Sequence, residues 1–129
     1  KTIILFGYHG KLIKLAGGIF HTHNHLADGR IEILVYLAVK EKLPSEILVK
    51  LTHLDNIEDA LLLLERFNKS IAEKLFHKLS NSIEKRSFTY VNRYVKTDME
   101  IAAIIFDRKR KIRWSGNKGN NYISYFKCN

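Results

Sequence analysis

Apolar residues open the chain in one unbroken run. Residues 2–6 are β-branched or large apolar side chains that end at Gly7, a pattern that predicts a buried strand. A tight loop over residues 7–9 follows. Apolar positions then recur at helical spacing over residues 10–20, with Lys11 and Lys14 on the opposite face. Because a buried strand rarely opens a complete protein, we expect this strand, loop and helix to begin a fragment of a longer chain.

Helical periodicity dominates the middle of the chain. Pro44 stops one predicted helix and begins the next, because a proline costs no hydrogen bond in the first turn of a helix. Asp55 and Ser70 each precede a glutamate by three residues, which is the capping-box spacing at a helix start. We expect five or six helices in the middle, including segments at about 28–42, 44–53, 56–67, 70–80 and 83–95.

Strand patterns return near the end of the chain. The apolar runs 99–106 and 112–114 flank a charged segment and predict two antiparallel strands joined by a turn. Residues 116–121 have the composition of a loop, and residues 122–126 are a candidate edge strand. We therefore expect a single α/β domain over residues 1–129, helix-rich and layered, with a small sheet in a Rossmann-like three-layer arrangement.

Composition agrees with one globular domain. The chain has 129 residues, 46% of them apolar, and a single cysteine. These values exclude a disordered chain, a collagen-like chain and a disulfide scaffold. The sequence contains neither an apolar run of about 18 residues that would span a membrane nor the pattern of a signal peptide. We expect a cytoplasmic protein without membrane contact.

The charge is concentrated at the two ends of the chain. Lys and Arg number 22 against 13 Asp and Glu, a formal net charge of +9. Residues 1–14 carry +3 and residues 107–129 carry +6, whereas the residues between them are balanced. This distribution indicates local anion-binding surfaces more than a general adjustment of solubility. The alternative for residues 108–111 is a solvated basic turn.

Three clusters are candidates for chemistry. The first is residues 7–11, Gly-Tyr-His-Gly-Lys, between the first strand and its helix. A helix start offers unpaired N–H groups and a partial positive charge, so with Lys11 and Lys14 it suits a carboxylate or phosphate. The segment lacks the glycine patterns of dinucleotide and P-loop sites. The alternative is a glycine turn that packs the strand against the helix.

The second cluster places His21, His23 and His25 at alternate positions ahead of Asp28. Imidazole and carboxylate groups are ligands for zinc and related divalent ions, and the segment is similar to the His-x-His-x-Asp-His loop of metallo-β-lactamase-like hydrolases. However, the match to that loop is imperfect, and the chain lacks the long β-sandwich that follows it. Polar substrate binding and a structural polar turn are the alternatives.

The third cluster combines the basic residues 108–113 with nearby aromatic residues. Basic and aromatic side chains together are typical of single-stranded nucleic acid binding, through phosphate pairing and base stacking. An ordinary basic turn beside buried strand aromatics accounts for the same residues. No nucleic-acid motif is present, so a nucleic-acid partner is not our first expectation.

Residues 7–32 together carry a family resemblance. The pattern Gly7-x-x-Gly10-Lys11-x-x-Lys14-Leu15-Ala16-x-Gly18-Ile19-x-x-Thr22-His23, followed by Ala27-Asp28-Gly29-Arg30-x-Glu32, resembles the cobalt-precorrin-5B C(1)-methyltransferase family of anaerobic cobalamin biosynthesis. Members of that family are considerably longer, so this chain resembles their C-terminal part. The downstream helices, strand, turn and strand agree with the family in outline. The resemblance implies an N-terminal domain of the same chain as a partner.

The resemblance also implies the activity and its participants. The enzyme would move a methyl group from S-adenosyl-L-methionine to a ring carbon of a cobalt-containing tetrapyrrole, with no protein-bound metal. Methyl transfer needs chiefly alignment, so His23 and Asp28 are expected as catalytic residues that shape the site or handle a proton. The expected substrate- or donor-binding residues are Gly7, His9, Gly10, Lys11, Lys14, Thr22, Arg30 and Glu32. A metal-dependent hydrolase and a nucleic-acid module remain the rival hypotheses.

Overall fold

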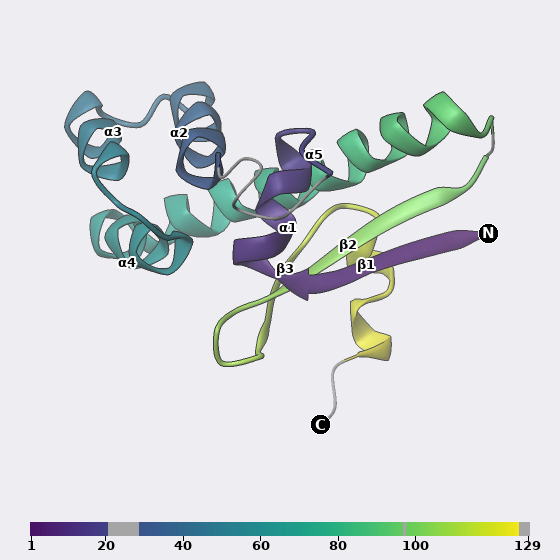
Figure 1. Ribbon diagram of the computed structural model, residues 1–129. Coiled ribbons are helices and arrows are strands. Elements are labelled where there is room, and N and C mark those ends of the chain that lie inside the picture. The colour runs from purple at the N-terminus through teal and green to yellow at the C-terminus, as the bar shows by residue number, and fades with distance from the viewer. Residues whose placement is uncertain (21–28, 97, 127–129) are drawn as a thin grey trace.

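A small mixed sheet forms the centre of the fold. The computed structural model describes residues 1–20, 29–96 and 98–126. β1 (Thr2–Tyr8) pairs in parallel with β2 (Glu100–Phe106), and β3 (Ile112–Ser115) pairs antiparallel with β2 on its other side. Tyr8 lies opposite Phe106 in the parallel register. The carboxyl ends of β1 and β2 therefore meet at one edge of the sheet, although most of the chain separates them (Figure 1).

Five α-helices account for most of the described chain. They are α1 (His9–Ala16), α2 (Arg30–Lys40), α3 (Ser45–Thr52), α4 (Ile57–Phe67) and α5 (Lys69–Tyr94). α5 runs along the sheet with α1 beside it, whereas α2, α3 and α4 form a group at one end of the molecule (Figure 1). The core lies between these helices and one face of the sheet, where Ile13, Phe76 and Ala103 are completely buried. Burial of this apolar surface is the main force that holds the helices against the sheet.

The other face of the sheet is contacted by the segment that follows β3. From the end of β3 the chain passes close to β2, where the 3₁₀ turn at Gly119–Asn121 lies near Ala103. It then reaches the second face, where the Phe126 ring lies 5.3 Å from that of Phe6. The α/β class with a small sheet is confirmed. A Rossmann-like three-layer arrangement is not confirmed, because the described helices pack against one face and short turns lie on the other.

The first strand differs from the sequence-based expectation. We expected β1 to be buried, but Ile3 and Phe6 are 40% and 46% exposed. The reason is its position: in the described sheet β1 is one of the two edge strands, with β2 as its neighbour on one side. The expected loop at residues 7–9 is also absent, because β1 ends at Tyr8 and α1 begins at His9.

The ends of α1 and α5 correct two further expectations. We expected a helix over residues 10–20, but α1 ends at Ala16. Gly18 adopts a left-handed φ of 78°, and the N–H groups of Gly18 and Ile19 bind the carbonyls of Leu15 and Lys14, which is a Schellman termination. At residues 70–95, where two helices were expected, the single helix α5 continues through a polar stretch because one buried stripe extends from Ala72 to Ser87.

The structure also corrects the expected helix caps and the expected edge strand in the C-terminal segment. Asn56 caps α4 and Asn68 caps α5, each by accepting backbone N–H bonds, in place of the expected Asp55 and Ser70. In both helices an asparagine at the N-cap position satisfies these free donors. Residues 122–126, the candidate edge strand, contain a 3₁₀ turn at Ile123–Tyr125. The antiparallel pair with its charged turn is confirmed.

Candidate functional site

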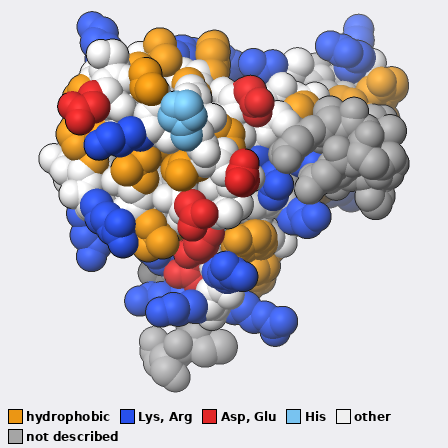
Figure 2. Space-filling view, turned by 60° about the vertical axis from the view of Figure 1, so that its left-hand side comes forward, with side chains coloured by type: hydrophobic (Ala, Val, Ile, Leu, Met, Phe, Trp, Pro, Cys, Tyr) orange, Lys and Arg blue, Asp and Glu red, His pale blue; other side chains and the backbone are white. Residues whose placement is uncertain are grey.

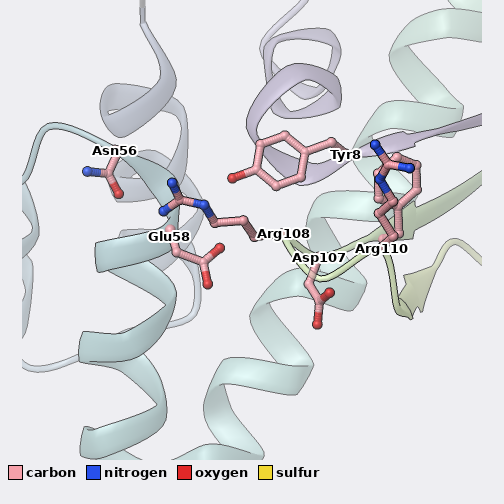
Figure 3. Close-up of a pocket in the computed structure, with 7 residues that line it drawn as sticks. Tyr8, Asn56, Glu58, Asp107, Arg108 and Arg110 are labelled. Carbon is pink, nitrogen blue, oxygen red and sulfur yellow. The ribbon is translucent and has the colours of Figure 1, made fainter.

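An open cleft lies at the edge where the parallel strands end. Tyr8 and Phe106, the last residues of β1 and β2, form part of its wall. The turn after β2 and the start of α4 form the rest (Figure 3). The cleft has a volume of about 530 Å³ and is lined by Tyr8, Asn56, Glu58, Phe106, Asp107, Arg108 and Arg110. Ligands of α/β folds commonly bind outside the carboxyl ends of parallel strands, so this position suits a binding site.

A buried histidine is paired with Glu58, one of the residues that line this cleft. His9, the first residue of α1, is completely buried, and its Nε2 lies 3.0 Å from Oε2 of Glu58. The rings of Tyr8 and Trp114 lie 4.2 Å and 5.9 Å from the imidazole. Burial lowers the pKa of His9 below its ordinary value, although the hydrogen bond and the charge of Glu58 act against this. The neutral imidazole is therefore favoured, and Nε2–H donates to the carboxylate.

The turn after β2 is held by the carboxylate of Asp107. Its Oδ1 accepts the backbone N–H groups of Lys109 at 2.9 Å and Lys111 at 3.1 Å. Burial alone would raise the pKa of Asp107, but these two bonds and the neighbouring guanidinium of Arg113 outweigh it and hold the pKa below its ordinary value. Asp107 is consequently ionised near neutral pH and rigidly oriented.

Arg113 links this turn to two helices. Its guanidinium donates to Glu65 of α4 and Glu73 of α5, both at 3.1 Å, and to Asp107 at 3.4 Å. It also lies over the Trp114 ring, 4.6 Å from the centroid. Burial would lower the pKa of Arg113, but its hydrogen bonds to the three carboxylates raise it. This arginine is a structural cross-link between β3, α4 and α5.

Tyr8 carries the phenol of the cleft. The pKa of Tyr8 is raised, chiefly by burial and further by the nearby charge of Glu58, while the charges of Arg108 and Arg30 act to lower it. The hydroxyl is thus protonated near neutral pH and able to donate a hydrogen bond. In Figure 3 it is directed to the side on which the Arg108 guanidinium extends between Asn56 and Glu58. Arg110 lies on the other side of the Tyr8 ring.

The surface around the cleft carries both signs of charge. Figure 2 views the molecule with the side of α2, α3 and α4 turned forward, and its Asp and Glu side chains run down toward a group of Lys and Arg side chains at the lower end. Arg108 and Arg110 are both exposed, unlike Asp107, which is buried. Glu58 and Asp107 each accept hydrogen bonds from inside the protein, whereas Arg108 and Arg110 are the exposed charged residues of the cleft lining.

The sequence-predicted binding residues occupy different environments. Lys11 is exposed on α1, whereas Lys14 is completely buried. Arg30 begins α2 and Glu32 is exposed in its first turn. Gly7 and Gly10 lie against side chains, since a Cβ at Gly10 would come within 2.6 Å of the Tyr8 ring. Thr22, His23 and Asp28, like His21 and His25, lie outside the described residues, and their roles remain predictions.

Several residues of the cleft were not anticipated. The sequence indicates Glu58 only as half of a capping box and Asp107 only as part of a charged turn, whereas Arg108 and Arg110 belong to the cluster considered for nucleic-acid binding. Their approach to Tyr8 depends on the parallel pairing of β1 with β2, which no local pattern encodes. One signal was available: both strands end in an aromatic residue followed at once by a titratable one, Tyr8-His9 and Phe106-Asp107.

The described residues offer neither a cluster of metal-binding side chains nor a membrane-spanning helix. No group of three or more His, Cys, Asp or Glu side chains there is positioned to hold a metal ion. The predicted histidine cluster lies outside this part of the chain. Nor do the helices of residues 1–20, 29–96 and 98–126 include one with the length and apolarity needed to cross a membrane.

The fold and the cleft together define an α/β domain with an open, arginine-lined cleft at the carboxyl edge of its parallel strands. Comparison with known families gives the particular member of this class. The model described as "CbiD, C-terminal domain" matches residues 21–117, and the chain belongs to this family. The family resemblance inferred from residues 7–32 is thereby confirmed.

Curated relatives carry one shared name. The chain is 83% identical over 126 residues to the cobalt-precorrin-5B C(1)-methyltransferase of Prochlorococcus marinus strain MIT 9312. Proteins of the same name from strains MIT 9515 and MIT 9303 are 69% and 46% identical over 127 and 124 residues. These alignments cover 98%, 98% and 96% of the chain. The hydrolase and nucleic-acid hypotheses receive no support from these relatives.

The match covers only part of each relative. The chain spans about a third of their length, 34%, 34% and 32% for these three. It corresponds to their C-terminal part, as the family description states. No solved structure matches the chain.

Proposed function

We propose that this chain is the C-terminal part of a methyltransferase that methylates ring carbon 1 of cobalt-precorrin-5B in cobalamin biosynthesis. The observation that carries this proposal is the 83% identity to a protein named for that reaction. The methyl donor is S-adenosyl-L-methionine, and the enzyme acts in the cytoplasm. The bond between sulfur and methyl breaks as the bond to the ring carbon forms, and S-adenosyl-L-homocysteine leaves.

The chemistry of the substrate agrees with the charge of the cleft. A tetrapyrrole intermediate carries acetate and propionate groups around its ring, and guanidinium groups bind carboxylates with two parallel hydrogen bonds. The N-terminus of α1 adds a partial positive charge at the same edge, next to Tyr8. Exposed Lys11 is proposed to contact the ligand directly. Buried His9, in the first turn of α1, and buried Lys14, in its last turn, are proposed to act from within by holding this helix in place.

We keep the remaining sequence-based roles as proposals. His23 and Asp28 shape the reaction site or handle a proton, and Thr22, Arg30 and Glu32 bind substrate or donor. The position of Arg30 supports its assignment. Its charge acts to lower the pKa of Tyr8, so Arg30 lies near the cleft. No protein-bound metal is required for transfer from a sulfonium, in which alignment of donor and acceptor does most of the work.

The sheet face that bears Phe6 is proposed to receive a further layer in the longer protein. Phe6 and Phe126 are 46% and 40% exposed on that face, and Tyr125 near them is 81% exposed. Apolar rings left in contact with water indicate a surface that another part of the protein covers. The preceding part of the chain is the proposed partner, and it would complete the three-layer arrangement.

The reaction itself is the test of this proposal. The full-length protein is incubated with cobalt-precorrin-5B and S-adenosyl-L-methionine labelled in its methyl group, and the tetrapyrrole is analysed by mass spectrometry and NMR. The label is expected at ring carbon 1, together with one S-adenosyl-L-homocysteine per methyl group. Label at another carbon, or none in the tetrapyrrole, would contradict the assignment.

Two variants of the same protein test the residue roles. Replacing His23 by Ala is expected to lower turnover with little change in tetrapyrrole binding, and Lys11→Ala is expected to weaken binding. Lys50→Ala is a matched control, because Lys50 is exposed on α3 and pairs only with its helix neighbour Glu46 among described residues. Unchanged binding and turnover in both test variants would remove these two assignments.

A further inference from the structure

The basic turn between β2 and β3 contains arginines of two kinds. Arg113 at its end is held by Asp107, Glu65 and Glu73, as described above. Arg108 and Arg110 form no ion pair with a carboxylate in residues 1–20, 29–96 and 98–126, although both line the cleft. Their guanidinium groups are therefore available to a ligand, whereas that of Arg113 is committed to the fold.

The backbone of Arg110 supports a role for its side chain. Its φ is 62°, in the left-handed region, which is unfavourable for a residue with a Cβ and favours glycine. The turn does not need a side chain there, because it is held by the Asp107 carboxylate and by the bond from Arg110 N–H to the Asp107 carbonyl at 2.9 Å. An arginine kept in a conformation that costs free energy points to a use for its charge.

Among the described residues, neither acid of the cleft forms an ion pair with Arg108 or Arg110. Glu58 accepts from His9 at 3.0 Å, and Asp107 accepts from two backbone N–H groups and from Arg113. Each carboxylate therefore has donors inside the protein. Figure 3 places the Arg108 and Arg110 guanidinium groups on opposite sides of Tyr8, whose protonated hydroxyl is a donor on the Arg108 side.

We infer that Arg108 and Arg110 are substrate-binding residues, which hold two carboxylates of the tetrapyrrole at opposite sides of the cleft, with Tyr8 as a hydrogen-bond donor beside Arg108. The inference rests on the proposed function, because that function supplies a ligand with carboxylates around its rim. It also assigns a use to the basic turn, which the family resemblance of residues 7–32 leaves without one. Planar carboxylates match the fork of a guanidinium better than the point charge of a lysine.

The test uses the full-length protein with single substitutions in the turn. Arg110→Gly relieves the left-handed φ and so should fold at least as well as the wild type. Arg108→Gln keeps a polar side chain without the charge. Lys109→Gln is the matched control, because Lys109 is exposed in the same turn but does not line the cleft. Circular dichroism and thermal unfolding confirm that each variant is folded.

Binding is measured by calorimetry with cobyrinic acid and with the same corrinoid after its carboxylates are converted to amides. Each arginine variant is expected to weaken binding of the acid about 10-fold, as for loss of one charge-assisted hydrogen bond, and to leave the Kd for the amide unchanged. The KM for S-adenosyl-L-methionine should not change. Lys109→Gln should bind both corrinoids as the wild type does.

The outcomes separate this inference from the proposed function. Methyl transfer by the wild type, together with arginine variants that bind the acid as tightly as the control, would overturn the inference and leave the function intact. A wild type that neither binds corrinoids nor transfers methyl would overturn both. Loss of affinity for a single-stranded oligonucleotide, with unchanged affinity for cobyrinic acid, would assign the arginines to nucleic acid and also overturn the inference.

Discussion

His9 occupies a site in which burial and a charged neighbour oppose each other. The imidazole is fully enclosed and only its Nε2 has a hydrogen-bond partner among the described residues, because Nδ1 is buried without one. Protonation would add a charge in an apolar environment next to the Trp114 ring. The carboxylate of Glu58 compensates for part of that cost but not for all of it, so the pKa is lowered.

This balance predicts a pH dependence of stability. The unfolded chain protonates His9 near its ordinary pKa of about 6.5, whereas the folded chain does so only at lower pH. The free energy of unfolding is therefore expected to fall as pH decreases from about 6.5 toward the lowered pKa. Urea unfolding between about pH 5 and 7.5 measures this. His9→Gln, which can still donate to Glu58, should show a shallower slope, and equal slopes would contradict the prediction.

Asp107 is the residue on which the geometry of the basic turn depends. Asp107→Ala is expected to destabilise the protein by about 2 kcal/mol, because two backbone N–H groups and Arg113 lose a charged acceptor. Asp107→Asn should cost less, since its amide oxygen still accepts. Chemical denaturation measures both variants. Lys109→Ala keeps the backbone N–H that Asp107 binds and serves as the control, and a neutral Asp107→Ala would show that the turn is held by other contacts.

At the scale of elements, α5 organises the sheet and the C-terminal segment together. Glu84 projects from this helix and is 7% exposed. Its Oε1 accepts the N–H groups of Ala103 in β2 at 3.0 Å and of Gly119 at 2.7 Å. Its Oε2 accepts the N–H of Lys118 at 3.2 Å. One carboxylate thus supplies partners for one backbone N–H of β2 and two of the segment that follows β3.

Replacing this carboxylate is expected to loosen the attachment of the C-terminal segment. Glu84→Gln removes the charge and places an amide N–H toward backbone donors, with an expected loss of about 2 kcal/mol in the free energy of unfolding. Hydrogen exchange should accelerate most at residues 116–119. Glu46→Gln is the control, because the Glu46 side chain is 79% exposed. Equal exchange in both variants would show that apolar contacts alone hold the segment.

At the scale of the whole molecule, the net charge of +9 acts against the compact state. The exposed Lys and Arg residues repel one another, whereas the ion pairs of Arg113 are partly buried and less easily screened. Raising NaCl from about 0.01 M to about 0.1 M shortens the Debye length from about 30 Å to about 10 Å. The free energy of unfolding should increase, by on the order of 1 kcal/mol, and urea unfolding at both salt concentrations measures it. A decrease would show that attractive pairs outweigh the repulsion.

The secondary structure was largely predictable because it depends on local patterns. The charged segment after Phe106 produces a turn between two apolar runs, and Pro44 separates two helices, both as expected. The continuous α5 was not predictable, because its polar stretch is stabilised by contacts outside the helix. Asn81 there accepts the N–H of Asn117, a residue after β3, at 2.7 Å.

The sequence by itself determined the family, most of the helices, the hairpin and the two basic ends of the chain, since each depends on residues close together in the sequence. Only the tertiary structure decided that the two basic ends approach one another. Parallel pairing of β1 with β2 brings Tyr8 beside Phe106, and it joins segments from opposite ends of the described chain. Packing of the helices against the sheet, and not local preference, selects that pairing. The same packing buries His9 and leaves Arg108 and Arg110 open to the cleft.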